Sequence, residues 1–280
     1  MHAINYQDAD VGNQLVASLQ HIGFAVLRNH PLDTPLLEQL YREWLAFFHS
    51  SDKHNYRFRE DVENGTQEGY IPPEISETAV GETAKDLKEF YHVVPGGRVP
   101  EALQQNIEAF RAAAFALGRE LGALIQASMP AQAAQLLSEP LTDMFSAEDS
   151  MLRVLHYPPL SDADQNTEAV RAAAHEDINL ITLLPVSEQP GLQVKDVHGQ
   201  WLELPSQPGD LVINTGDMLS EATNGFYPST THRVVNPTDA SGNVSRVSIP
   251  YFLGARPDVV LSARHTAGSY LQERLDILNA

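Results

Sequence analysis

The chain has 280 residues, 42% of them hydrophobic, which is enough to bury a sizeable core in one large domain or two small ones. Eighteen basic residues against 37 acidic ones give a formal charge of -19, which disfavours a nucleic-acid partner because phosphate backbones are also negative. No cysteine is present, so disulfides, thiolate zinc sites, iron–sulfur clusters and cysteine nucleophiles are excluded. We expect a cytoplasmic protein without membrane contact, because the sequence shows neither a signal peptide nor an apolar run of roughly 20 residues.

Apolar residues at helical spacing predict two helices near the start of the chain. Residues 12–22 form the first, which Gly23 ends, and residues 24–27 follow as a short apolar run typical of a buried strand. Residues 35–48 form the second, and the proline at its start suits a first helical turn.

The stretch from residue 50 to 98 has an irregular pattern with scattered glycines and prolines. Such a long irregular segment often covers a functional site, although a plain surface loop has the same composition. Residues 101–129 are rich in alanine and predict one long helix, or two helices broken near Gly118 or Gly122.

From residue 151 onward the pattern changes to short apolar runs separated by turn residues. The runs are 151–157, 178–184, 192–197, 210–214, 232–236 and 246–253. Regular short strands separated by turn residues predict a β-sandwich or a β-barrel. An amphipathic helix is predicted over residues 266–278, at the end of the chain. We therefore divide one domain into an N-terminal helix and strand region, a long helix with a linker, a β core and a C-terminal helix, at residues 1–100, 101–150, 151–262 and 263–280.

A histidine and an aspartate two residues apart mark a candidate metal site in the β half. Side chains at i and i+2 share one face of a strand, so His175 and Asp177 would point together, with Glu176 facing away. On a helix the same pair would diverge by about 200°. His232 begins a later apolar run, and a closed β fold can bring the two strands side by side. Two imidazoles and one carboxylate can hold one face of an octahedral Fe(II) and leave the other face open for O2 and a co-substrate.

Other interpretations of these residues stay open. A lone histidine in a strand is more often structural, and a His-x-Asp pair alone is weak evidence in a chain with 11 histidines. The helical zinc-protease motif is absent, since Ile178 and Asn179 stand where its second histidine is needed. Further along, Arg246 and Ser248 are two residues apart and can hold a small carboxylate beside such a metal.

The sequence around these residues is similar to that of a known family. The segments that carry the similarity are 23–30, 174–177, 191–194, 213–219, 223–225, 229–235 and 246–252. Their order and spacing resemble the iron- and 2-oxoglutarate-dependent oxygenases, in the branch that includes isopenicillin N synthase. The resemblance covers nearly the whole chain, strongly from about residue 150 and weakly between 50 and 140.

The resemblance implies a mainly β fold with flanking helices, whose core over residues 151–262 is a double-stranded β-helix, or jelly roll. It also implies that His175, Asp177 and His232 are the ligands of Fe(II). With them it implies 2-oxoglutarate as a co-substrate and O2 as the oxidant.

By the same resemblance, Arg246 and Ser248 hold the distal carboxylate of 2-oxoglutarate. Tyr157 matches a family tyrosine that donates a hydrogen bond to that group, although it also suits a core position at a strand end. Two positions depart from the family pattern. Leu155 stands where an asparagine is common, which puts a polar contact near the co-substrate in doubt, and Pro228 stands where a lysine is common, which affects the surface.

The reaction implied is oxidative decarboxylation of 2-oxoglutarate to succinate, coupled to hydrogen abstraction from a small-molecule substrate. An amino acid, a peptide or a secondary metabolite is the kind of substrate expected from family habit. The ligand set does not choose between hydroxylation, desaturation and ring closure, because all begin with the same abstraction. The sequence gives no indication of the oligomeric state.

Two alternatives compete with this function. An oxidase like isopenicillin N synthase uses no 2-oxoglutarate, and its Arg-x-Ser pair and tyrosine hold the carboxylate of the substrate itself. A metal-binding β-barrel without redox chemistry would explain the triad but not Arg246 and Ser248.

Candidate substrate-lining residues lie in the irregular stretch, although each also suits a surface or packing role. They are Tyr70, Lys88, Phe90, Tyr91 and His92. Arg153 shares a face with Leu155 and Tyr157 if that strand is regular, and there it would meet a second anionic group near the iron.

Overall fold

The computed structural model describes residues 2–59, 68–75, 86–161, 170–237 and 242–278. Parts of the predicted irregular stretch, residues 60–67 and 76–85, lie outside the described chain.

Most described strands belong to one large mixed sheet. In order across this sheet they are β1 (Ile4–Asn5), β2 (Phe24–Arg28), β10 (Leu211–Thr215), β7 (Ile181–Pro185), β13 (Tyr251–Ala255), β5 (Phe145–Tyr157), β4 (Glu89–Val93) and β3 (Gly69–Ile71). One further strand, β12 (Arg246–Ser248), also pairs with β5. A smaller sheet has the order β6 (Ala172–His175), β11 (His232–Val234), β8 (Leu192–Lys195) and β9 (Trp201–Glu203).

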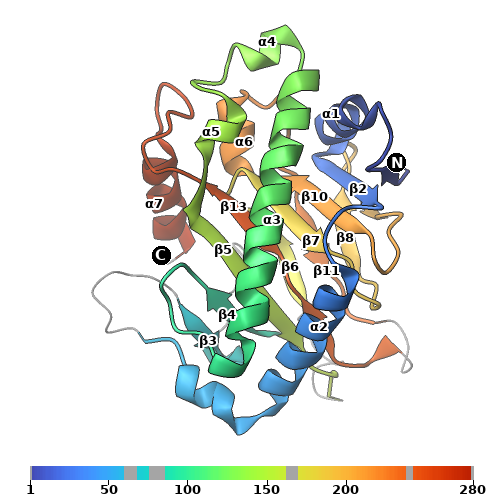
Figure 1. Cartoon of the computed structure of the whole chain (residues 1–280), viewed down its shortest axis with the longest axis vertical. Helices are drawn as coiled ribbons and strands as arrows, with labels where there is room; N and C mark the ends of the chain where they lie inside the picture. Colours follow the sequence, from blue (N-terminus) through green and yellow to red (C-terminus); the bar gives the residue numbers. More distant parts are fainter. Residues whose placement is uncertain (1, 60–67, 76–85, 162–169, 238–241, 279–280) are drawn as a thin grey trace.

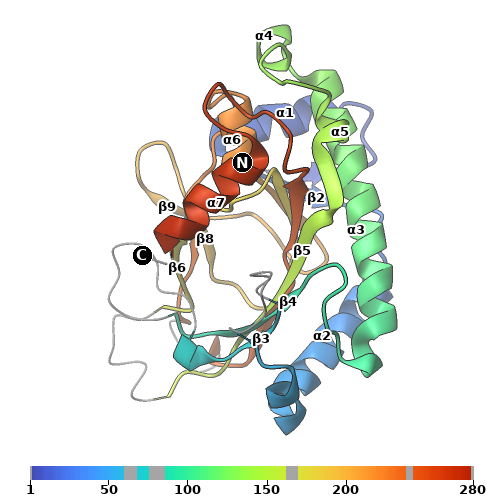
Figure 2. The same cartoon turned by 90° about the vertical axis from the view of Figure 1, so that its left-hand side faces the viewer.

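The helices lie outside these sheets. They are α1 (Val11–Ile22), α2 (Thr34–His49), α3 (Glu101–Ser128), α4 (Ala131–Ala134), α5 (Leu141–Met144), α6 (Asp217–Ala222) and α7 (Ala267–Leu278), with short 3-10 turns η1 (Ser51–Tyr56) and η2 (Pro73–Ile75). Figure 1 shows α3 and α2 running across the larger sheet. Figure 2 shows the smaller sheet, with β6 and β8, facing β5 of the larger sheet, and α3 on the outer side of β5. This is the predicted double-stranded β-helix with flanking helices.

The long helix α3 is a single helix despite its two glycines. A Cβ added at Gly118 would collide with the side chain of Leu253 on β13, and one at Gly122 would collide with Phe145 at the start of β5. The glycines therefore let the helix lie close against the sheet, and the alternative of a break near them is wrong.

The strands β4 and β5 separate two apolar regions. On the helix side, Leu152 and Val154 belong to the main core that α1, α2 and α3 cover. On the other side, Phe90, Leu155 and Tyr157 form a smaller cluster between the two sheets. Alternation along each strand thus sends every second side chain toward the space between the sheets, where the candidate site lies.

The predicted strand boundaries differ from the observed ones in several places; β7, for example, begins at Ile181 and not at residue 178. The run 246–253 is two strands, because β12 ends before Pro250, which lacks the N–H that a ladder needs. The strand β5 begins earlier than predicted, at Phe145. The stretch described as irregular contains β3 and β4. The division into four parts stays a prediction.

No helix in the described ranges is both long and apolar enough to cross a membrane. The expected cytoplasmic location stays a prediction.

Candidate metal centre and co-substrate pocket

His175, Asp177 and His232 converge on one point. His175 ends β6, His232 begins β11, and the two residues lie directly opposite each other in the sheet register. Nε2 of His175 is 4.0 Å from Oδ1 of Asp177, and Nε2 of His232 is 3.7 Å from the same oxygen. The three candidate ligand atoms all lie within 4.8 Å of one another, which is the spacing that a single bound ion requires.

Asp177 reaches this point by a route that differs from the prediction. β6 ends at His175, so the interpretation of His175 and Asp177 as neighbours on one strand face is wrong. Asp177 lies in the loop after β6, and its carbonyl accepts a 2.8 Å hydrogen bond from the N–H of Asp217 at the start of α6. Glu176 does face away, and its carboxylate accepts a hydrogen bond from Thr231.

Backbone carbonyls orient both imidazoles. Nδ1 of His175 lies 2.8 Å from the carbonyl of Ala173, and Nδ1 of His232 lies 3.1 Å from that of Thr230. Each Nδ1 can donate its hydrogen there, which leaves each Nε2 as an acceptor directed at the centre. The side chain of His175 is 43% exposed and that of His232 only 11%, so the open side of the centre lies toward His175.

The carboxylate of Asp177 is held through one oxygen. Its Oδ2 accepts hydrogen bonds of 2.5 Å from Thr182 and 2.8 Å from Asn214, and Thr182 in turn accepts from Asn179 at 2.9 Å. Oδ1 remains directed at the two imidazoles. A ligand oxygen fixed through its partner oxygen is typical of metal sites.

The protonation of the centre suits metal binding. Although part of the His175 side chain is exposed, desolvation by the surrounding chain and then the neighbouring imidazole of His232 lower its pKa to about 4, so its ring is neutral at pH 7. Burial would raise the pKa of Asp177, but the two imidazoles and the hydrogen bonds from Thr182 and Asn214 outweigh it and lower the pKa. A neutral imidazole and an ionised carboxylate are the forms that bind metals.

A second group of predicted residues meets on β5 and β12. Arg246 lies opposite Tyr157 in the register of the two strands, and its guanidinium carbon is 5.5 Å from the ring centre of Tyr157. Arg246 is 5% exposed, and its Nε and Nη1 have no hydrogen-bond partner among the described residues. Arg246 and Ser248 line a cavity of about 160 Å³ together with Gly191 and Leu192.

This pocket fits a small carboxylate. A buried guanidinium with unpaired donors is unfavourable unless an anion completes it. The cavity has room for a molecule of several heavy atoms, since a water needs only about 10–15 Å³. The predicted residues Arg246, Ser248 and Tyr157 are therefore suited to the distal carboxylate of 2-oxoglutarate.

The candidate substrate-lining residues divide between the two faces of β4. Phe90 faces the space between the sheets, where the guanidinium carbon of Arg153 lies 5.0 Å from its ring centre and where Nε of Arg153 donates to Nε2 of His92 at 2.8 Å. Arg153 therefore does share this face. Tyr70 and Tyr91 belong to the main core on the helix side, so they cannot line the site.

One interaction that sequence reasoning missed supports the metal centre from the segment that precedes β4. Asp86 is buried, accepts a 2.9 Å hydrogen bond from the N–H of Ala173 and pairs with Lys88 at 2.7 Å. The carbonyl of Ala173 is the group that orients His175. Asp86 thus fixes the peptide next to a candidate metal ligand.

Some missed residues did leave a signal in the sequence. Thr182 is the one polar residue of the apolar strand β7, and Asn214 is one of two at the end of the apolar strand β10; each is buried. A polar side chain at a position that should be buried requires a partner, which here is Asp177. Asp86 had no such signal because its partner is set by the register between distant segments.

Comparisons with known proteins agree with this geometry. The model of the 2OG-Fe(II) oxygenase superfamily matches residues 148–255, and that of the N-terminal region of non-haem dioxygenases in morphine synthesis matches residues 3–114. A solved structure of an oxygenase from Shewanella oneidensis is 45% identical, covers 100% of both chains and has a TM-score of 0.88. A 2OG-Fe(II) oxygenase family protein from Caulobacter crescentus is 32% identical, covers 99% of both chains and has a TM-score of 0.78. A proline hydroxylase from Petromyces alliaceus is 29% identical over 85% of this chain and 79% of its own.

The chain belongs to the 2OG-Fe(II) oxygenase superfamily. It is therefore an oxidoreductase that depends on Fe(II) and 2-oxoglutarate, as predicted, and neither the oxidase without 2-oxoglutarate nor the barrel without redox chemistry is favoured. The narrower assignment to the branch of isopenicillin N synthase stays a prediction.

Proposed function

We propose that His175, Asp177 and His232 are the ligands of the catalytic Fe(II). The observation that carries this proposal is the convergence of their ligand atoms within 4.8 Å. The donor set of two imidazole nitrogens and one carboxylate oxygen suits Fe(II) and leaves open positions for O2 and a co-substrate. The hydrogen bonds on each Nδ1 and on Oδ2 of Asp177 orient the ligands before a metal arrives.

Arg246 would bind the distal carboxylate of 2-oxoglutarate, with Ser248 and Tyr157 as further hydrogen-bond donors. The support for this role is that Arg246 is buried and keeps two unpaired donors beside the cavity. Charge-assisted hydrogen bonds from a buried guanidinium to carboxylate oxygens are among the strong ones, so a carboxylate suits these free donors. Burial lowers the pKa of Arg246, and a bound anion would again favour the charged form of its guanidinium.

The iron, when bound, would supply the reaction of O2 with the two organic molecules: one oxygen atom of O2 ends in the succinate that forms as 2-oxoglutarate loses CO2, and the other accounts for the oxidation of the substrate. The chain supplies position and exclusion of water. Its Nε2 atoms and Oδ1 hold one side of the metal, and Arg246 holds the far end of the co-substrate. The apolar cluster of Phe90, Leu155 and Tyr157 keeps the space between the sheets dry.

The substrate we propose is a small molecule that carries a carboxylate, such as an amino acid, a peptide or a secondary metabolite. The wall beside the centre supports this class. The guanidinium carbon of Arg153 lies 5.0 Å from the ring centre of Phe90 and 5.7 Å from that of Phe252. Phe252 lies opposite Thr182, which holds the carboxylate of Asp177. A cation among aromatic rings is suited to a small organic acid.

Two measurements test the proposed roles. Anaerobic addition of 2-oxoglutarate to the Fe(II) protein should give a visible charge-transfer band, and air should then release succinate slowly even without substrate. Arg246→Met should need a higher 2-oxoglutarate concentration for the same band while it binds Fe(II) normally. A band of full strength at the wild-type concentration would contradict the role of Arg246.

A further inference from the structure

Arg171 is a second buried guanidinium beside Tyr157. The residue directly precedes β6 and is 2% exposed. Its guanidinium carbon lies 6.0 Å from the ring centre of Tyr157, and that of Arg246 lies 5.5 Å from the same centre. Two cations thus meet at one aromatic ring.

Arg171 has more hydrogen-bond donors than the described chain has acceptors for them. Nη2 donates to the carbonyl of Val244 at 2.9 Å, and Nε is buried without a hydrogen-bond partner in the described ranges. No carboxylate of the described chain forms an ion pair with either Arg171 or Arg246. Burial, and after it the charge of Arg246, lowers the pKa of Arg171. Two unpaired buried cations near each other are unfavourable unless an anion binds.

The sheet register places the guanidinium of Arg246 near the backbone that follows Arg171. Ala172, next to Arg171, lies opposite Val234, and the N–H of Val235 donates to the carbonyl of Gly191 at 3.0 Å. A Cβ at Gly191 would lie 3.8 Å from Nη1 of Arg246. The end of Arg246 therefore lies beside the part of the smaller sheet from which Arg171 projects.

We propose that Arg171 is a second carboxylate-binding residue of the co-substrate site, and that it binds the distal carboxylate of 2-oxoglutarate together with Arg246. This inference rests on the proposed role of Arg246. The metal ligand His175 stands four residues after Arg171, about 13 Å away along an extended strand. The anion would then bind at the end of the site away from the metal, as the distal group of a chelating 2-oxo acid must.

A purely structural role would use only the bond from Arg171 to Val244. That role needs one donor and gives no reason for a buried cation with an unpaired Nε. The two roles differ in whether the effect of removing Arg171 depends on the ligand.

The experiment compares two ligands on protein loaded with Mn(II), which binds them without turnover. 2-Oxoglutarate carries the distal carboxylate, and 2-oxobutanoate has the same metal-binding end without it. Isothermal titration gives the Kd of each ligand for the wild type, Arg171→Met, Arg246→Met and the double variant. We expect Arg171→Met to raise the Kd of 2-oxoglutarate roughly tenfold to hundredfold. The Kd of 2-oxobutanoate should stay within about twofold, because it has no distal charge.

The remaining arms separate the possible failures. If Arg171→Met leaves the Kd of 2-oxoglutarate unchanged while Arg246→Met raises it, the inference about Arg171 is wrong and the proposed co-substrate site stands. If neither changes it, the proposed site itself is wrong. An equal rise for both ligands would assign Arg171 a structural role. In the double variant, a rise smaller than the product of the single ones would show that both residues bind the same group.

Arg171→Lys serves where the methionine variant does not fold. It keeps the charge but loses the planar guanidinium, so it should raise the Kd of 2-oxoglutarate above that of the wild type, by less than the tenfold to hundredfold expected for full loss of the charge, and leave that of 2-oxobutanoate unchanged. A lysine variant that binds 2-oxoglutarate as tightly as the wild type, with Mn(II) bound normally, would contradict the inference.

Discussion

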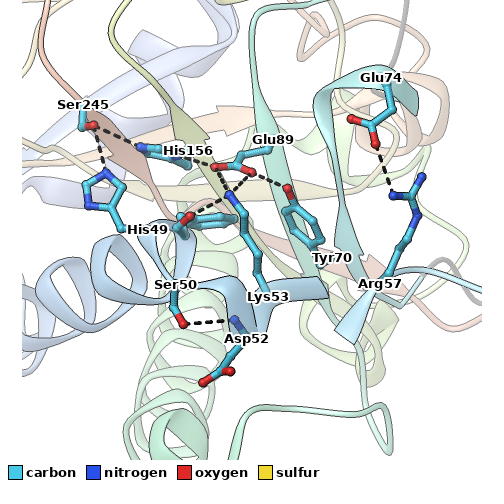
Figure 3. A network of polar contacts seen from close by, with 11 residues as sticks. His49, Ser50, Asp52, Lys53, Arg57, Tyr70, Glu74, Glu89, His156 and Ser245 are labelled. Carbon is cyan, nitrogen blue, oxygen red and sulfur yellow. Dashed lines mark hydrogen bonds and ion pairs between the residues drawn. The ribbon is translucent and has the colours of Figure 1, made fainter. Parts of the chain in front are cut away.

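The two faces of β4 and β5 bury polar groups in opposite ways. On the helix side, Figure 3 shows Glu89 surrounded by donors: Lys53 at 2.8 Å, His156 at 2.7 Å and the hydroxyl of Tyr70. His156 continues to Ser245 at 3.2 Å. Every group of this network finds its partner within the chain.

On the opposite side, between the two sheets (the barrel side), the buried groups of the metal centre and of the co-substrate pocket are incomplete. Arg246 and Arg171 keep unpaired donors, and the carboxylate of Asp177 directs one oxygen at two imidazoles rather than at a hydrogen-bond donor. Both faces bury charge, so burial alone does not distinguish a functional group from a structural one. What distinguishes them is whether the chain itself supplies the partner or leaves that place to a ligand.

The largest effect should follow from removing the carboxylate of Asp177, one oxygen of which is directed at the metal centre. Asp177→Ala removes one of three candidate ligands, so we expect Fe(II) binding to be lost, as measured by metal content after anaerobic loading and desalting. Glu176→Gln is the matched control, because Glu176 is the neighbouring acid but faces Thr231 instead of the centre. An Asp177→Ala protein that keeps a full equivalent of Fe(II) would contradict the proposed site.

Removing the carboxylate of Glu89, whose partners all belong to the chain, should lower the stability of the protein and leave Fe(II) binding unchanged. Glu89→Ala leaves Lys53 and His156 without their anion in a partly closed site, and the loss of a buried ion-pair partner costs about 3–5 kcal/mol of unfolding free energy. Urea unfolding measures this change. Fe(II) binding under native conditions should be unchanged, because Glu89 faces away from the metal centre.

An exposed acid gives the reference for that measurement. Glu38 forms a 4.0 Å pair with Arg42 one helical turn away, and its side chain is 66% exposed. Glu38→Ala should cost only about 0.3–0.5 kcal/mol. If Glu89→Ala cost no more than this, the complete network would not contribute to stability in the way that its geometry indicates.

Asp86 should show an intermediate behaviour, since it is complete itself but supports the incomplete site. Asp86→Asn keeps an acceptor for Ala173 and loses the charge that pairs with Lys88. We expect the Kd for Co(II), followed by its visible spectrum, to rise roughly tenfold, because groups behind a ligand affect metal affinity on that scale. An unchanged Kd would show that the peptide of Ala173 does not need Asp86 to orient His175.

Sequence reasoning reached the barrel-side triad more easily than the helix-side network. His175, Asp177 and His232 belong to residue types whose combination suggests a metal, and the family resemblance supports it. The helices α1 and α2 were also predictable, because their apolar residues keep a strict helical period. Each of these signals lies in a local pattern.

The remaining features depend on the pairing of distant segments. β4 reads Glu89-Phe90-Tyr91-His92-Val93, and all five residues are buried, so no alternation of polar and apolar residues marks it as a strand. Its register with β5 is what places Glu89 opposite His156 and His92 opposite Arg153. A single sequence holds no record of that register.

The smallest expected effect concerns the pH dependence of stability, and it tests the Glu89 network on the helix side specifically. Burial would raise the pKa of Glu89, but hydrogen bonds from His156, Lys53 and Tyr70 outweigh it and lower the pKa below its usual value. The ionised form is thus favoured by folding, so its contribution is present above the unfolded pKa of about 4.3 and is lost as the pH falls through the folded value.

Glu89→Gln removes this titration, and the urea midpoint of the variant should fall less steeply than that of the wild type as the pH drops below about 4.5. Equal slopes for the two proteins would mean that Glu89 ionises as easily unfolded as folded. The donors around it would then serve packing rather than charge, and the contrast between the two faces would rest on the unpaired arginines alone.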